Sequence, residues 1–73
     1  MAKATWHTAV YAFDNHEDNG LEYGMNVETV TFKSAAQTRN GLVRTADNKA
    51  FWDCVLNYNG YYIRLLTVDG NAA

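Results

Sequence analysis

The sequence feature that most constrains the fold is the dipeptide Asn59-Gly60, which separates two runs rich in aromatic and aliphatic residues. Asn-Gly favours a type I′ turn because both positions tolerate positive φ, and this turn matches the twist of a two-stranded hairpin. The flanking runs cover residues 51–58 and 61–68. We therefore predict a β-hairpin whose tip lies at the Asn-Gly pair.

A two-residue turn also fixes the register of this predicted hairpin. One face then carries only apolar and aromatic side chains apart from a threonine, in the cross-strand pairs Tyr58–Tyr61, Leu56–Ile63, Cys54–Leu65 and Trp52–Thr67. Trp52 becomes a candidate core residue, and its truncation to alanine would then cost about 3–5 kcal/mol. On the reverse face Asp53 and Arg64 lie diagonally and are a candidate ion pair.

The same segment allows a second interpretation, in which residues 47–58 form a helix. Asp47 would be the N-cap and Gly60 would end the helix, and several apolar residues between them have helical spacing. We favour the hairpin, because the helix leaves both the turn dipeptide and the cross-strand pairing unexplained.

Two strands are predicted in the N-terminal half. Residues 4–13 are rich in β-branched and aromatic types with apolar residues on both alternating faces, which predicts a strand covered at least partly on both sides. Residues 14–20 are polar and acidic and predict a turn. Residues 21–33 read as a strand whose apolar residues change parity, which predicts a β-bulge near Glu28-Thr29.

A helix is expected after the second strand, because Ser34 and Gln37 have the spacing of a capping box. A short helix would start at residue 35 and end near Gly41, or continue through it to about Arg44. A further short strand at 42–45 is an option. The predicted fold class is α+β, a small antiparallel sheet of ββαββ order with one short helix packed on one face.

The 73 residues are expected to form a single domain over 1–73, ordered from about 4 to 68, with 70–73 as a frayed tail. Cys54 is the single cysteine, so the chain has no internal disulfide, and a lone thiol suits a reducing compartment. No apolar run approaches the length of a transmembrane helix. We therefore expect a cytoplasmic protein without membrane contact.

No pattern of residues indicates chemistry. The acidic group at 14–18 does not fit the calcium-loop template, and no paired cysteine and histidine spacing suggests zinc. Ser34 is explained as a helix cap, Cys54 lies on a predicted apolar face where a thiol stays protonated, and His7 is expected as a half-exposed strand residue. We predict no catalytic residue, no cofactor and no metal, and thus no enzyme.

The predicted function is partner binding. Aromatic residues make up 14% of the chain, more than one small core can cover, and a hairpin tip is exposed by geometry. The candidate partner-binding residues are Tyr58, Asn59, Tyr61, Tyr62 and Arg64. We expect a small intracellular module that binds a larger protein, in the manner of phage and mobile-element inhibitors that block a host surface. A homodimer is a further expectation, because pairing covers exposed sheet edges.

A single-stranded nucleic-acid-binding protein is the alternative, with exposed aromatic side chains beside Arg64 as the base-stacking surface. Six scattered cationic residues and a net charge of −2 weigh against it, because affinity for phosphate backbones grows with the number of neutralised phosphates.

Overall fold

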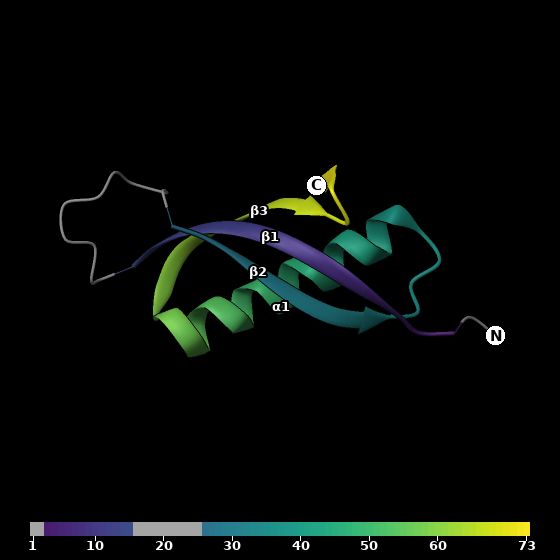
Figure 1. Cartoon of the computed structure of the whole chain (residues 1–73), viewed down its shortest axis with the longest axis horizontal. Coiled ribbons are helices and arrows are strands. Elements are labelled where there is room, and N and C mark those ends of the chain that lie inside the picture. Colours follow the sequence, from purple (N-terminus) through teal and green to yellow (C-terminus); the bar gives the residue numbers. More distant parts are fainter. Residues whose placement is uncertain (1–2, 16–25) are drawn as a thin grey trace.

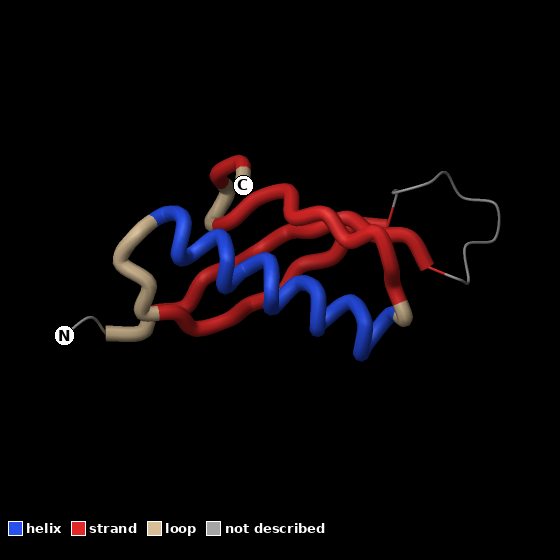
Figure 2. The backbone as a smooth tube through the Cα atoms, turned by 180° about the vertical axis from the view of Figure 1, so that it is seen from behind, coloured by secondary structure: helices blue, strands red, loops and turns tan. Residues whose placement is uncertain are grey.

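The computed structural model describes residues 3–15 and 26–73, which form an antiparallel sheet and one long helix. The elements are β1 (Thr5–Asn15), β2 (Asn26–Ser34), α1 (Arg39–Tyr58), β3 (Gly60–Val68) and β4 (Asn71–Ala72). The strands are arranged in the order β2-β1-β3-β4, and α1 lies across one face of the sheet (Figures 1 and 2). The predicted α+β class and the antiparallel pairing of the first two strands are confirmed.

The hairpin predicted at Asn59-Gly60 is wrong, because residues 51–58 form the last turns of α1. Asn59 does adopt positive φ (51°), but it does so as the C-cap of the helix, and its N–H donates to the carbonyl oxygen of Cys54. A left-handed residue serves a helix end as well as a hairpin turn, so the dipeptide alone does not decide between them. The helical alternative is correct in kind, although the helix starts at Arg39 and not near residue 47.

The start of α1 also differs from the prediction. Thr38 is the N-cap, and its Oγ1 accepts a hydrogen bond of 3.1 Å from the N–H of Gly41. The Ser34 hydroxyl instead accepts from the N–H of Ala36 at 3.1 Å in the connection after β2. Serine makes such local turns as readily as helix caps. The short helix from residue 35 and the strand at 42–45 are therefore wrong, and Gly41 lies inside α1.

The pairing of β1 with β2 is regular along its whole length, from Thr5 opposite Ser34 to Phe13 opposite Asn26. The bulge predicted near residues 28–29 is therefore absent from β2. Phe32 is buried against the helix, whereas Val27 is 52% exposed on the other face. The apparent change of parity came from one exposed valine and from residues 21–25, which lie outside the described residues. The predicted turn at 14–20 is wrong at its start, because Asp14 and Asn15 belong to β1 and Asp14 is buried, and residues 16–20 lie outside the described residues.

The irregular strand is β3. Its register with β1 shifts between Val10 and Tyr11 and again between Ala12 and Asp14, each time by one extra residue in β3. Tyr62 has a φ of 52°, as is common at bulges. These shifts let Leu65 and Val68, which differ in parity, both pack on the helix-facing side of the sheet.

Small side chains bring α1 close to the sheet. Ala46, Ala50 and Cys54 are spaced four residues apart and are all fully buried. They divide the core into two adjoining clusters: one includes Ala9, Phe32, Ala46 and Val68, and the other includes Tyr11, Phe13, Ala50 and Cys54. The other face of β1 is exposed at Trp6 and Thr8 but buried at Ala12, which is 4% exposed, so the predicted partial cover of the first strand on both sides is confirmed in its second half.

The C-terminal residues form a strand, not a frayed tail. Asp69 and Gly70 both have positive φ (53° and 83°), as a type I′ turn requires, and they place Asn71 opposite Val68. The Arg39 guanidinium at the start of α1 donates hydrogen bonds to the carbonyl oxygens of Asn71 (3.2 Å) and Ala72 (2.9 Å). Asp69-Gly70 thus forms a tight hairpin between β3 and β4.

Candidate partner-binding surface

The residues predicted at a hairpin tip lie instead where α1 ends and β3 begins. Tyr58 is the last residue of the helix, and its ring stacks on Phe13 at a centroid distance of 5.3 Å. Burial raises the pKa of the Tyr58 phenol, and the Glu28 carboxylate raises it further. This contact gives Tyr58 a packing role at the end of the core.

Tyr61, Tyr62 and Arg64 follow in the first half of β3. The rings of Tyr61 and Tyr62 meet edge to face at 5.1 Å, and Tyr62 is 75% exposed. Arg64 is exposed and lies opposite Ala12 in the sheet. The ion pair expected with Asp53 does not form, because Asp53 belongs to α1 and not to a strand beside Arg64, and its carboxylate accepts hydrogen bonds from Tyr11 and Asn57. These three residues therefore lie along β3 and not at the tip of a hairpin. Their role in binding stays a prediction.

A larger apolar surface was missed in the sequence analysis. Trp52 and Leu56 lie on the side of α1 turned away from the sheet, and Phe51 lies on the flank beside Trp52. Phe51, Trp52 and Leu56 are 47%, 52% and 75% exposed. Phe51 and Trp52 meet edge to face at 5.2 Å. We call these three residues the helix patch. A helical projection of residues 47–58 would have revealed it, because apolar residues occur on all sides of that segment and one helix can bury only one side.

The exposed area of the helix patch can be estimated from its three side chains. A phenylalanine or tryptophan side chain offers roughly 150–250 Å², so the exposed parts of the three residues add up to on the order of 300 Å². The largest contiguous apolar patch of an ordinary monomer measures roughly 300–600 Å² and is often functional, and the helix patch reaches the lower end of this range. The patch ends toward the start of α1, where the exposed residues Arg44 and Asn48 occupy the same side of the helix.

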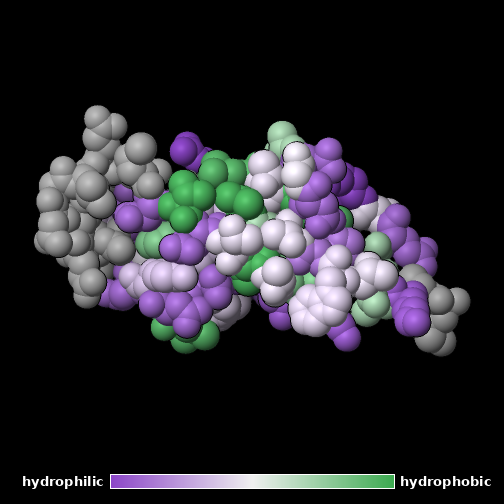
Figure 3. Space-filling model, viewed as in Figure 1, coloured by the Kyte–Doolittle hydropathy of each residue, from purple (hydrophilic) through white to green (hydrophobic). Residues whose placement is uncertain are grey.

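The opposite face of the molecule is the open side of the sheet, which is turned to the viewer in Figures 1 and 3. Figure 3 shows a mixture of apolar and polar side chains on it. Trp6 on this face is 67% exposed, and the Lys33 ammonium lies 5.2 Å from the indole centroid. Thr8 and Thr31 are exposed between the ends of this face. This face therefore mixes polar and apolar side chains, in contrast to the helix patch, and it carries a cation–aromatic pair.

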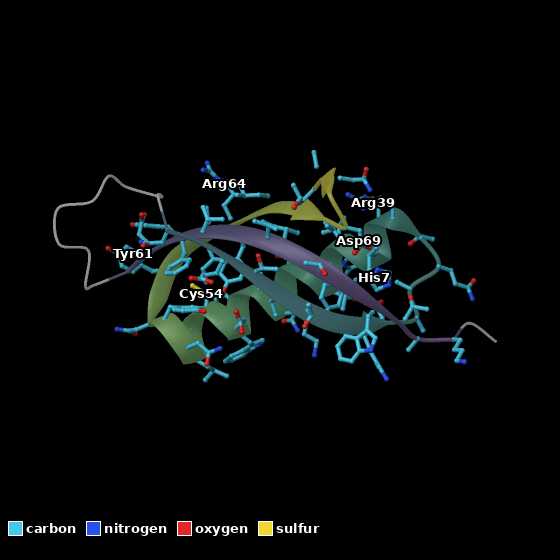
Figure 4. All side chains as sticks on the ribbon, in the orientation of Figure 1. His7, Arg39, Cys54, Tyr61, Arg64 and Asp69 are labelled. Carbon is cyan, nitrogen blue, oxygen red and sulfur yellow. The ribbon has the colours of Figure 1, made fainter. Side chains whose placement is uncertain are left out.

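A hydroxyl–imidazole–carboxylate chain joins β1 to the β3–β4 turn (Figure 4). His7 Nδ1 lies 2.6 Å from Asp69 Oδ2, and His7 Nε2 lies 3.0 Å from Thr5 Oγ1. Asp69 Oδ1 accepts the N–H of Thr8 at 2.9 Å, and the Asp69 N–H donates to the Thr8 carbonyl oxygen at 2.7 Å. The hydrogen bond from His7 lowers the pKa of Asp69, and the Thr8 N–H lowers it further. Together these contacts fasten the turn to the central strand.

Cys54 is enclosed by the core, and burial raises the pKa of its thiol. Figure 4 shows Cys54 and His7 near opposite ends of the molecule, so they do not form a nucleophile and base. Within residues 3–15 and 26–73, no three His, Cys, Asp or Glu side chains gather in a way that would hold a metal ion. Of the acidic group at 14–18, only Asp14 and Asn15 fall within the described residues.

No family model, curated protein or solved structure matches this chain. Among the described residues, α1 is the single α-helix, and it lacks the apolar length needed to cross a membrane.

Proposed function

We propose that this protein is a non-enzymatic binding module that docks its helix patch into an apolar groove on a larger protein. The observation that carries the proposal is the position of Phe51, Trp52 and Leu56, which lie together on the solvent side of α1 and contribute little to the core. Burying them on a partner would recover the hydrophobic free energy that the folded chain leaves unused.

The chemistry of the helix patch suits a binding anchor. Tryptophan is among the residues most enriched at energetic hot spots, and an apolar helix face that enters a groove is a common mode of recognition. The helix is rigid before binding, because Ala46, Ala50 and Cys54 hold its other side on the sheet. Little conformational entropy is therefore lost when the patch is buried.

The shape and area of the helix patch indicate a partner other than a second copy at this surface. Two identical patches facing each other would bury only about 600–800 Å², below the roughly 1,200 Å² of stable interfaces. Two convex helices also contact along a narrow line. A concave groove encloses more of each side chain, which favours a larger protein as the partner.

Occupation of a groove excludes whatever the groove otherwise binds, so the module would act as an inhibitor by blocking that surface. An 8.2 kDa chain with a net charge of −2 is suited to this role. Phage and mobile-element inhibitors of host proteins are the class in which we place it.

The proposal is tested with Trp52→Ala and with Trp6→Ala as the matched control, since both indoles are more than half exposed but lie on opposite faces. Partners are captured from nuclease-treated extract of the native cell and identified by mass spectrometry, and the best candidate is then purified and titrated. We expect Trp52→Ala to weaken binding by about 2–4 kcal/mol, the range of a hot spot, and Trp6→Ala to leave it unchanged. Equal affinity of the two variants for the purified partner would contradict docking through α1.

Single-stranded nucleic-acid binding remains the alternative, and the cation–aromatic pair of Trp6 and Lys33 is the observation that favours it. Bases stack on exposed rings beside cations, and such binding weakens steeply with salt. The same two variants separate the functions. Salt-sensitive binding of an oligonucleotide that is lost in Trp6→Ala and kept in Trp52→Ala would replace the proposed function by this one.

A further inference from the structure

The two edges of the sheet differ in length and regularity. On one side the sheet ends in β4, which has two residues and is fastened by Arg39. On the other side it ends in β2, which has nine residues and keeps an unbroken register with β1. Within the described part of the chain, no further strand pairs with the outer side of β2.

A long and regular edge is a surface for strand pairing, because its outer N–H and C=O groups offer hydrogen bonds to another strand. Proteins usually block such edges with proline, with bulges or with several charges. β2 has no proline and no bulge, and its two charged residues, Glu28 and Lys33, lie toward its two ends. Glu28 also faces the helix side, where it acts on the Tyr58 phenol.

We propose that a second copy of this chain pairs with β2, antiparallel and about a two-fold axis at Thr31. In this register Val30 lies opposite Phe32 of the second copy, which is the β-branched and aromatic pairing that stabilises sheets. Thr29 lies opposite Lys33, and Glu28 lies opposite Ser34, so no like charges face each other. A shift of the axis to Val30 would place Glu28 opposite Phe32, a carboxylate against an aromatic ring.

A second copy suits this edge better than an extended peptide does. The β2 strand of another copy is already ordered by its pairing with β1, so no chain has to lose its conformational freedom on binding. A disordered peptide would have to become ordered along the whole strand. The low net charge of −2 per chain also keeps the repulsion between two copies small.

The pairing joins two four-stranded sheets into one sheet of eight strands, a size that single sheets commonly reach. A two-fold axis perpendicular to the sheet places both α1 helices on the same face. The helix patch lies on the side of α1 turned away from the sheet, so the dimer leaves both patches accessible. The dimer and the proposed docking of the helix patch therefore use separate surfaces, so an experiment can disprove one proposal without disproving the other.

The interface is small, because it consists mainly of one strand pair, so we expect a weak dimer with a dissociation constant of micromolar order. Sedimentation velocity of the full chain over a range of concentrations should show a monomer that converts to a dimer. A monomer up to millimolar concentration would overturn the proposal.

Thr31→Lys tests the position of the axis, because it sets two ammonium groups opposite each other. We expect the dissociation constant to rise about fivefold, and high salt to restore the dimer, since about 1 M salt screens charges beyond roughly 3 Å. Thr8→Lys is the control: it adds the same charge to the same face, but on the central strand. Equal weakening by the two variants would place the interface on the open face of the sheet and overturn edge pairing.

A direct measurement does not depend on a variant that folds. In a mixture of ¹⁵N-labelled and ¹³C-labelled chains, isotope-filtered NMR should show contacts between Val30 of one copy and Phe32 of the other. A dimer that lacks these contacts would overturn the proposal. A dimer that is lost in Trp52→Ala and kept in Thr31→Lys would also overturn it and would assign the association to the helix patch.

Discussion

The phenol of Tyr11 donates a hydrogen bond of 2.6 Å to Oδ2 of Asp53 and so joins the central strand to the helix at the core cluster that contains Tyr11, Phe13, Ala50 and Cys54. Tyr11 is fully buried. Burial raises the pKa of its phenol far above the ordinary value near 10, and the hydrogen bond to Asp53 and the charge of that carboxylate raise it further.

This contact predicts a loss of stability at alkaline pH. In the unfolded chain Tyr11 loses its proton near about pH 10, whereas in the folded chain it keeps the proton. The unfolded state therefore gains free energy from ionisation, and the free energy of unfolding should fall as the pH rises above about 10. Urea titrations between pH 7 and pH 11 measure this fall.

Tyr11→Phe removes both the hydrogen bond and the ionisable group. We expect it to cost about 1–3 kcal/mol at pH 7, because a bond to a charged acceptor is lost, and to make the alkaline fall shallower. Tyr58 and Cys54 also have raised pKa values and would account for the remaining slope. An unchanged slope in Tyr11→Phe would show that its phenol ionises equally well in both states.

Gly60 predicts a strong effect of one methyl group. A Cβ at this position would meet Sγ of Cys54 and would lie 2.8 Å from Cδ2 of Phe13. We expect Gly60→Ala to destabilise the fold by about 1–3 kcal/mol through overpacking, and Cys54→Ala in the same chain to recover part of that loss. The control is Gly70→Ala, whose φ is 83° but whose Cβ would meet no atom within 4 Å, so that backbone strain alone acts. Chemical denaturation of the four chains gives the comparison.

Cys54 should be unreactive in the folded protein. Its side chain is fully buried, and burial raises the pKa of the thiol, which disfavours the nucleophilic thiolate. A disulfide reagent at about pH 8 is expected to modify the thiol only as fast as the protein unfolds, and at the rate of a free cysteine in denaturant. Rapid modification of the folded chain would mean that the junction of α1 and β3 opens without global unfolding.

Asp69 predicts a loss of stability in acid. Its pKa is lowered in the folded state, mainly by the His7 hydrogen bond, so its contribution is complete above about pH 4 and is lost as the pH falls through the lower folded value. Asp69→Asn should therefore narrow the difference in unfolding free energy between pH 6 and pH 3. Asp47→Asn, on an exposed part of α1, is the control and should not narrow it.

The loss of this carboxylate should also be visible locally. The Asp69 N–H donates to the Thr8 carbonyl oxygen at 2.7 Å, and its hydrogen exchange reports on the attachment of the β3–β4 turn. Faster exchange of this amide in Asp69→Asn, with unchanged exchange in α1, is the expected pattern. Uniform acceleration throughout the chain would point to a general loss of stability.

The prediction that Trp52 belongs to the core is wrong, and the physical reason is the change of period. In a strand, Trp52 shares a face with Cys54 and Leu56, whereas in a helix it lies far around the axis from Cys54. Cys54 is buried in the structure, and Trp52 and Leu56 are exposed. Because residues 51–58 were predicted as a strand, Trp52 and Leu56 were assigned to the core and the candidate binding residues were placed at a hairpin tip.

The two X-Gly dipeptides show how far local signals reach. Asn59-Gly60 and Asp69-Gly70 both call for a residue with positive φ, and both positions have it. Only the second forms a hairpin, because Val68 and Asn71 pair across it, while the first caps a helix. The preference of a residue for positive φ is local. Whether that residue caps a helix or turns a hairpin depends on which neighbouring side chains are buried by other parts of the chain.

By itself the sequence determined the α+β class, the antiparallel pairing of the first two strands and the positive φ at Asn59, because these follow from local periodicity and from the steric freedom of Asn. Tertiary structure decided whether residues 51–58 became strand or helix. Ala46, Ala50 and Cys54 are small enough to let a helix approach Tyr11 and Phe13 closely, and that packing outweighs the β propensity of the aromatic residues beside them.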